Sequence, residues 1–271
     1  MIRIAWPRVA AVGGKEWADI RSSTAIWTPL LLTLAVVAVP FAMVVFGADA
    51  LRELTDDADL QRALALAVQR WPAFAALDPL AQGQAFIFQQ FLVLVLLVPV
   101  QGGLAFASHT VVGDKQARAI EPLLATPLTS AELLLGKTLG ALIPALLVGA
   151  FAVGVYALGV TWLARPGVAD ALANVRTALL VGAIGPLATL IALQVAVIAS
   201  SRTNDPRTAQ QWGTFVILPM VGLMISQMTG LFWLGAWVLV LASVLLAGIW
   251  VALAGLSWAI FDRERILTEW R

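Results

Sequence analysis

The sequence has 271 residues but no cysteine, only one histidine and few charged residues. Without cysteine the chain can form neither disulfides nor thiolate metal sites. One histidine, His109, cannot supply the clustered ligands of an intramembrane metalloprotease, which excludes that class. An intramembrane serine protease is not excluded, because a serine can meet this histidine through tertiary contact, but nothing in the sequence supports one. Charged residues make up 12% and hydrophobic residues 61%, which indicates a membrane protein.

Uncharged runs long enough to cross a bilayer occur six times. A helix needs about 20 apolar residues to cross the hydrocarbon core. The predicted spans are residues 26–46, 84–107, 138–163, 177–199, 211–228 and 233–261. The first run begins too far along the chain, and is too long, to be a cleaved signal peptide. We therefore expect an all-α membrane protein with six transmembrane helices, in one domain that covers residues 1–271.

Lysine and arginine are unevenly distributed among the connecting segments. Both termini together with segments 108–137 and 200–210 hold 12 of them, and the opposite set holds 5. Because positive residues favour the cytoplasm, we expect both termini there, in an integral protein of the cell (inner) membrane. The external segment 47–83 is acidic, with a helix predicted to start near residues 55–57. We interpret it as a solvated connector on the outer surface rather than an external cation or substrate site.

Residues 129–140 contain Gly-Lys-Thr, the end of a nucleotide-binding P-loop. Such a loop needs a glycine at the position that Ala131 occupies, and it follows a buried strand. Here Thr129 and Glu132 have the spacing of a capping box, which marks the start of a helix. We therefore expect a helix that continues into the third span, and no nucleotide site.

The same helix carries two glycines and a lysine at its start. Gly136 and Gly140 have the spacing that lets a neighbouring helix approach closely. Lys137 lies at the predicted cytoplasmic border, and we expect its side chain to extend to the lipid headgroups.

The segment that precedes this helix contains two prolines. Pro122 suits the first position of a helix, and Pro127 would end it about one turn later, with Leu123 and Leu124 at a cytoplasmic surface. One turn is not stable alone. It must lie against the protein's own cytoplasmic face or dock into a groove of a partner, and these residues alone leave both open.

Four segments resemble permease subunits of the ABC type-2 transporter family. "GDKQARAIEPLLATPLTSAELLLGKTLGALIP" (113–144) resembles the family's signature region, which leads into the third span. Residues 15–41 resemble its cytoplasmic elbow helix entering the first span. Residues 200–220 and 260–267 resemble its second cytoplasmic connector and its exit from the last span. The four segments occur in the family's order.

The resemblance implies the fold of a type V exporter. Six spans would be accompanied by an N-terminal interfacial elbow helix at residues 3–22 and a short cytoplasmic coupling helix between spans two and three. The chain would pair with a second copy or a close paralogue and bind two separate ATPase subunits, besides membrane lipids, with no nucleic acid. It would not be an enzyme by itself and would hold no cofactor or metal, because ATP and Mg would bind to the ATPase.

The resemblance also implies roles for particular residues. The residues that would sit in the groove of the ATPase are Glu121, Pro122, Leu123, Leu124, Thr126 and Pro127. Each leucine would contribute about 1.5 to 3 kcal/mol by burial. The elbow helix carries basic residues and Trp6 and Trp17, a composition suited to the inner membrane interface, and we expect it to touch the ATPase as well.

The cargo is constrained by the absence of charge well inside the predicted spans. Ion and proton pathways usually need such charges, so we favour an apolar or amphipathic cargo such as a lipid, drug or polyketide. For the uncharged polar residues we favour interhelical hydrogen bonding over substrate contact. The family likeness would place a path along the second and fifth spans. The first residues to test there are Gln89, Gln90, Ser226 and Gln227. Pro99, followed by two glycines, predicts a kink in the second span.

Three functions therefore remain, and the permease of an ATP-driven exporter leads. An ion-gradient-driven secondary transporter would usually have more spans and a buried charge. A non-transporting membrane scaffold or intramembrane enzyme would depend on neither ATP nor a gradient.

Overall fold

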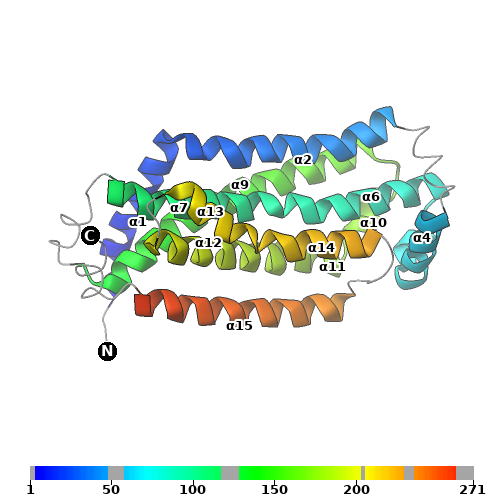
Figure 1. The fold of residues 1–271 in the computed structure, drawn as a ribbon. Coiled ribbons are helices and arrows are strands. Elements are labelled where there is room, and N and C mark those ends of the chain that lie inside the picture. The colour runs from blue at the N-terminus through cyan, green and yellow to red at the C-terminus, as the bar shows by residue number, and fades with distance from the viewer. Residues whose placement is uncertain (1–3, 48–57, 117–127, 203–204, 229–234, 261–271) are drawn as a thin grey trace.

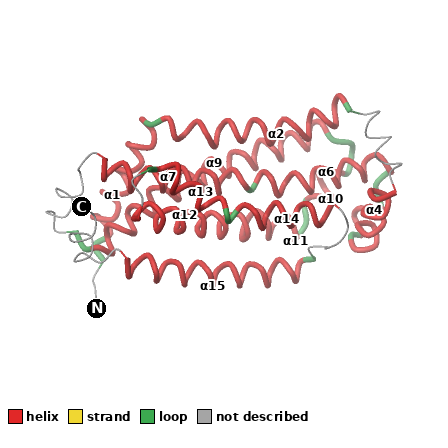
Figure 2. Tube along the Cα trace, viewed as in Figure 1, coloured by secondary structure: helices red, strands yellow, loops and turns green. Residues whose placement is uncertain are grey.

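The computed structural model describes residues 4–47, 58–116, 128–202, 205–228 and 235–260, and the regular structure within these ranges is helical. The α-helices are α1 (Trp6–Ser22), α2 (Trp27–Phe46), α4 (Ala58–Arg70), α5 (Pro72–Ala75), α6 (Pro79–Val95), α7 (Leu97–Gln116), α9 (Ser130–Leu163), α10 (Val168–Leu172), α11 (Val175–Leu179), α12 (Gly185–Arg202), α13 (Pro206–Thr214), α14 (Ile217–Met228) and α15 (Ala236–Ile260). A 3-10 turn, η1 (Thr24–Ile26), precedes α2, and a π-helical turn, η2 (Leu180–Ile184), joins α11 to α12. Most of the long helices lie side by side and run roughly parallel to one another (Figures 1 and 2).

Five helical stretches in the described ranges are long and apolar enough to cross a membrane. They are Trp27–Phe46, Pro79–Thr110, Ser130–Leu163, Val175–Ser200 and Ala236–Ala259. These overlap five of the six predicted spans, and the protein is an all-α membrane protein. The fifth predicted span, residues 211–228, does not form one continuous helix. It is divided between α13 and α14, and α14 has only 12 residues.

Prolines lie beside the interruptions in the second, fourth and fifth predicted spans, although Pro40 and Pro144 lie inside continuous helices. A proline ring collides with the carbonyl group four residues earlier and cannot donate to it. Pro99 is four residues after Val95, where α6 ends, so the second span is interrupted at Leu96, where a kink was predicted. Pro219 is four residues after Phe215, where the chain turns between α13 and α14. Pro186 likewise follows the π-helical turn that interrupts the fourth span.

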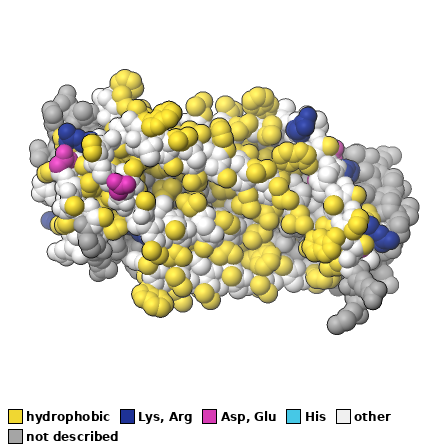
Figure 3. Space-filling view, turned by 180° about the vertical axis from the view of Figure 1, so that it is seen from behind, with side chains coloured by type: hydrophobic (Ala, Val, Ile, Leu, Met, Phe, Trp, Pro, Cys, Tyr) yellow, Lys and Arg dark blue, Asp and Glu magenta, His cyan; other side chains and the backbone are white. Residues whose placement is uncertain are grey.

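The core is centred on α7, which packs between α9 and α12. Pro99 on α7 fits against Gly149 of α9, where an added Cβ would lie 2.6 Å from the proline Cβ. By contrast α15 is largely exposed, with Trp237 and Trp258 near its two ends. These tryptophans are separated by about 30 Å along the helix, the thickness of a bilayer core. Hydrophobic side chains cover the side of the molecule between its charged ends (Figure 3). A lipid-facing surface with aromatic residues at both borders has this composition.

The end of the bundle opposite α1 is covered by α4 and α5 (Figure 1). Helix α4 lies in the acidic segment where a surface helix was predicted, although its predicted start at 55–57 is outside the described residues. At this end the guanidinium carbon of Arg176 lies 5.2 Å from the centroid of the Trp71 ring, and Arg165 pairs with Asp78 at 2.9 Å. Both basic side chains therefore have an aromatic or acidic neighbour here.

Candidate functional site

Helix α1 lies directly against the start of α9, where the two glycines are. A Cβ added at Gly136 would lie 2.5 Å from the Cβ of Val12, and one added at Gly140 would lie 2.7 Å from the Cβ of Glu16. These distances are below any normal carbon contact, so larger residues would force the helices apart. The glycine pair therefore does let a neighbouring helix approach closely, as predicted, and that neighbour is α1.

The start of α9 is the capping box that the sequence predicts. The backbone N–H of Glu132 donates to Thr129 Oγ1 at 3.2 Å, and the Glu132 carboxylate accepts from the backbone N–H of Thr129 at 2.9 Å. The other carboxylate oxygen accepts from the backbone N–H of Ala5 at 2.8 Å, and Arg8 Nη1 lies 3.7 Å from the oxygen that binds Thr129. The Gly-Lys-Thr sequence thus lies within a helix, and Glu132 joins that helix to the beginning of α1.

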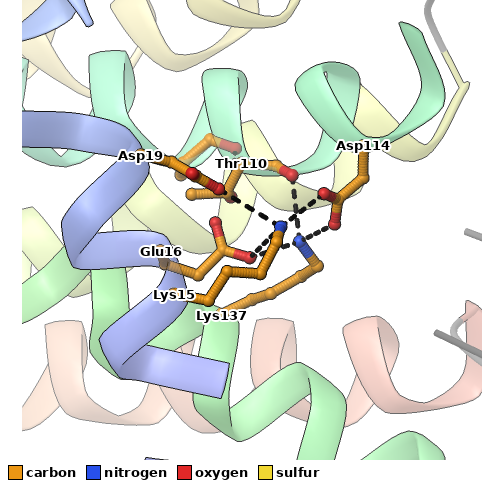
Figure 4. A network of polar contacts seen from close by, with 7 residues as sticks. Lys15, Glu16, Asp19, Thr110, Asp114 and Lys137 are labelled. Atoms are coloured by element: carbon orange, nitrogen blue, oxygen red, sulfur yellow. Dashed lines mark hydrogen bonds and ion pairs between the residues drawn. The ribbon is translucent and has the colours of Figure 1, made fainter. Parts of the chain in front are cut away.

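Lys137 is the centre of a polar cluster that joins α1, α7 and α9 (Figure 4). Its ammonium donates to Glu16 on α1 at 2.7 Å, and to both Asp114 and the backbone oxygen of Thr110 (2.9 Å) on α7. The residue is only 4% exposed. The prediction that Lys137 extends to the lipid headgroups is therefore wrong. Two carboxylates of neighbouring helices lie within reach of the ammonium, and they bind it inside the protein.

Lys15 extends the cluster toward the surface. Its ammonium donates to the second oxygen of Asp114 at 2.7 Å and lies 3.2 Å from Asp19 and 3.7 Å from Glu16. Asp114 therefore accepts from two lysines, one on α1 and one on α9. We call these five side chains, those of Lys15, Glu16, Asp19, Asp114 and Lys137, the ionic cluster.

The two buried carboxylates experience different environments. Burial raises the pKa of Glu16, and the pairing with Lys137 and Lys15 only partly opposes this effect. Burial also acts on Asp114, but Lys137 and Lys15 outweigh it and hold the pKa of that carboxyl below its usual value. The pKa of Lys15 is raised, because its acidic partners outweigh its partial burial. The charged form is therefore more favourable at Asp114 than at Glu16.

The ionic cluster lies next to the segment predicted to couple to an ATPase. Asp114 is in the last turn of α7, which ends at Gln116, and α9 begins at Ser130. The predicted coupling residues between these helices are outside the described residues, namely Glu121, Pro122, Leu123, Leu124, Thr126 and Pro127. Both helices that flank this segment are nevertheless held to α1, one through Asp114 and the other through Lys137.

The predicted path residues are not all brought together. Gln89 and Gln90, on α6, are 1% and 2% exposed. Thr177 donates to Gln89 Oε1 over a long 3.5 Å. Within the described part of the chain, Gln89 Nε2 and both amide atoms of Gln90 lack a hydrogen-bond partner. Ser226 and Gln227 lie in the last turn of α14, and their side chains are outside what the structure describes.

Other polar residues in the spans form the interhelical hydrogen bonds that we favoured. Ser257 on α15 donates to Gln194 on α12 at 3.0 Å. The Tyr156 hydroxyl on α9 donates to the backbone oxygen of Phe88 on α6 at 2.6 Å. Such bonds fix neighbouring helices to each other. The buried amides of Gln89 and Gln90 differ from this pattern.

Within the described part of the chain, His109 does not pair with the serine beside it. It is exposed near the end of α7, and the hydroxyl of the adjacent Ser108 donates to the backbone oxygen of Ala105 at 2.9 Å. The serine is fully buried within its own helix. Ser108 and His109 are therefore not arranged as nucleophile and base.

Glu16 and Asp114 were not identified from the sequence. For Glu16 a signal existed, because the buried residues of α1 are Val9, Val12, Glu16 and Ile20, at helical spacing. An acidic residue on the apolar face of an amphipathic helix indicates a buried partner. Asp114 has no such signal, since its partners come from α1 and α9.

The different environments of the two carboxylates predict unequal effects of neutralising them. We expect Asp114→Asn to lower the stability by about 3 kcal/mol, as for a broken buried ion pair, and Glu16→Gln to lower it clearly less. The reason is that the ionised form is stabilised at Asp114 and disfavoured by burial at Glu16. Thermal unfolding of both variants in the same detergent measures the order. Equal losses, or a larger loss for Glu16→Gln, would contradict it.

Comparison with known proteins identifies the family of this chain. The model for "ABC-2 family transporter protein" matches residues 10–238, which include most of α1, the ionic cluster, the predicted coupling segment and the predicted path residues. No curated protein matches the chain. Because the match covers well over half of the sequence, the chain belongs to the ABC-2 transporter family and is a membrane-spanning permease of an ABC transporter.

Proposed function

We propose that this permease is a subunit of an exporter, forms its translocation path and is driven by a separate ATPase. The observation that carries the proposal is the family match over residues 10–238, a range that includes the predicted coupling segment. The attachment of both flanking helices to α1 supports it, because a segment that receives force needs firmly held ends. A gradient-driven secondary transporter is favoured less, because the ionic cluster lies at the end of the bundle that carries α1 rather than midway along it (Figure 1).

The proposed assembly has two permeases and two ATPase subunits. The second permease is another copy of this chain or a close paralogue. ATP and Mg bind to the ATPase subunits, and hydrolysis takes place there. The coupling residues between α7 and α9 dock into a groove of the ATPase, with Leu123 and Leu124 as the buried anchors.

Charging the two leucines is expected to abolish docking. We expect an ATPase with Walker motifs to co-purify with the tagged wild type from its native host and to be absent from Leu123→Glu/Leu124→Glu. Burying two carboxylates without partners costs several kcal/mol, enough to lower an affinity more than a hundredfold. Mass spectrometry of the eluate identifies the partner.

A matched control adds the same charges elsewhere. Ala75→Glu/Ala76→Glu places two carboxylates on exposed positions at the opposite end of the bundle, and we expect it to retain the ATPase. If the wild type is folded and no ATPase co-elutes with it, the proposed function loses its support and gradient-driven transport becomes the function to test.

We propose that the protein resides in the cell membrane with α1 and both termini on the cytoplasmic side. The excess of lysine and arginine in the segments on that side supports this orientation. The opposite end, with α4, α5 and α10, then faces outward.

The absence of cysteine makes the orientation simple to test. Ala173 and Ser22 are exposed at opposite ends of the bundle. In intact cells, we expect an impermeant thiol reagent to label Ala173→Cys and not Ser22→Cys, and to label both after the membrane is opened. The reverse pattern would place α1 outside.

The proposed path runs beside α6 and α14, along Gln89, Gln90, Ser226 and Gln227, for an apolar or amphipathic cargo. The buried amides of Gln89 and Gln90 support it. An amide left without hydrogen bonds costs about 1–3 kcal/mol, so a state in which water or cargo reaches these groups would relieve that cost.

Accessibility of Gln90 during turnover tests the path. In the complex with its ATPase, we expect Gln90→Cys to react slowly with an impermeant thiol reagent at rest, and at least several-fold faster during ATP hydrolysis. Ala85→Cys, also buried on α6, serves as the control and should stay unreactive. Labelling of Gln90→Cys at the same rate in both states would remove it from the path.

A further inference from the structure

The ionic cluster joins three helices at one point. Glu16 belongs to α1, Asp114 to α7 and Lys137 to α9. The Lys137 ammonium contacts both carboxylates, and its third donor bonds the backbone oxygen of Thr110. An ammonium has three donors, so all of them are used for contacts with α1 and α7.

The position of these contacts matters because of what lies between the helices. The predicted coupling segment leaves the end of α7 just after Asp114 and enters α9 shortly before Lys137. A force on this segment reaches both helices at their ends. If the ends of α7 and α9 were free to separate, a displacement of the coupling segment would move these ends apart and would not be passed on to the rest of the helices.

Stability alone is a weak reason to bury these charges. Replacing a buried ion pair by apolar residues is often neutral or stabilising, whereas removing one partner is strongly destabilising. Close apolar packing of α1 on α9 is already present at Gly136 and Gly140. The charges add a registration of three helices, because one ammonium on α9 must stay within hydrogen-bond distance of acceptors on both α1 and α7.

We propose that Lys137 is a positioning residue for coupling: by binding Glu16 and Asp114 it makes α1 and the ends of α7 and α9 move as one body when the coupling segment is displaced. The proposal rests on the proposed function, since it assumes an ATPase that acts on that segment. Asp114 also links α7 to α1 without Lys137, because its other oxygen accepts from Lys15 on α1. Glu16 is bound by the Lys137 ammonium at 2.7 Å and completes the link between α9 and α1.

The test measures motion and coupling separately. Because the native chain has no cysteine, spin labels can be placed at Ala18→Cys on α1 and Gly154→Cys on α9. Both sites are exposed, and nothing lies within 4 Å of a Cβ at Gly154. The helical rise separates them by on the order of 20 Å, within the range of pulsed electron resonance. The sample is the complex of the permease with its co-purified ATPase in lipid nanodiscs, with and without ATP.

In the wild type we expect one narrow distance distribution that ATP does not change, and an ATPase rate that depends on the permease. In Lys137→Met we expect the ATPase to remain bound, the distribution to broaden on ATP binding, and the permease-dependent part of the rate to be lost. Lys137→Arg keeps the cation in a larger side chain, so we expect it to retain more of the permease-dependent rate than Lys137→Met. Arg165→Met, which breaks an exposed ion pair at the opposite end of the bundle, is the matched control and should resemble the wild type.

A variant with all three charges removed separates positioning from folding. Glu16→Gln/Asp114→Asn/Lys137→Met leaves no uncompensated charge among these three residues, so we expect its melting temperature to exceed that of Lys137→Met. If coupling nevertheless stays lost, the role is positional. The proposal is overturned if this triple variant regains permease-dependent hydrolysis, or if Lys137→Met keeps both the narrow distribution and the wild-type rate.

The exporter function and the positioning role of Lys137 are contradicted by different results. If no ATPase accompanies the wild type, the proposed function fails and the labels have no ATP-dependent signal to report. If the ATPase binds and is stimulated equally by the wild type and Lys137→Met, only the positioning role fails.

Discussion

The burial of the Lys137 ammonium is the constraint on which the end of the bundle that carries α1 depends. A cation on the apolar bundle cannot remain there without nearby anions, because the cost of its desolvation is several kcal/mol. Glu16 and Asp114 meet that requirement only if α1 folds back along α9 and the last turn of α7 reaches the same point. The Lys137 charge thus holds α1 against α9, together with the hydrogen bond from Ala5 to Glu132, and the glycines at 136 and 140 provide the space for this helix.

Much of the fold could be predicted because it is encoded locally. Hydrophobic runs indicate the membrane helices, the Thr129 capping box indicates the start of α9, and Pro99 indicates the interruption between α6 and α7. The division of the predicted span at 211–228 had a similar local cause in Pro219. We predicted one span because the run of apolar residues is continuous. Hydropathy measures transfer to lipid and does not register the carbonyl that a proline displaces.

The candidate site was harder to predict because its contacts are not local. Lys137 meets a residue 121 positions away and another 23 positions away. A lysine at the border of an apolar run has two physical solutions, extension to the headgroups or pairing inside the protein, and the side chain alone does not distinguish them. The deciding information was on α1, where Glu16 shares a face with Val9, Val12 and Ile20. An acidic residue at that position needs a cation on the helix that covers it.

The two sets of buried polar groups in this protein differ in a way that suits their proposed tasks. In the ionic cluster, Lys137 has a partner for each of its donors, and a satisfied network is rigid because any displacement breaks a charged hydrogen bond. At Gln89 and Gln90 the described amide groups are largely unsatisfied, so displacement there costs only the long hydrogen bond from Thr177 to Gln89, and exposure to water or cargo would gain others. A transporter needs both properties, rigidity where force enters and a low cost of opening where cargo passes. The first is located at the helices that flank the predicted coupling segment, and the second within α6 on the proposed path. Helix α7, which follows α6 directly after the break at Leu96, connects them.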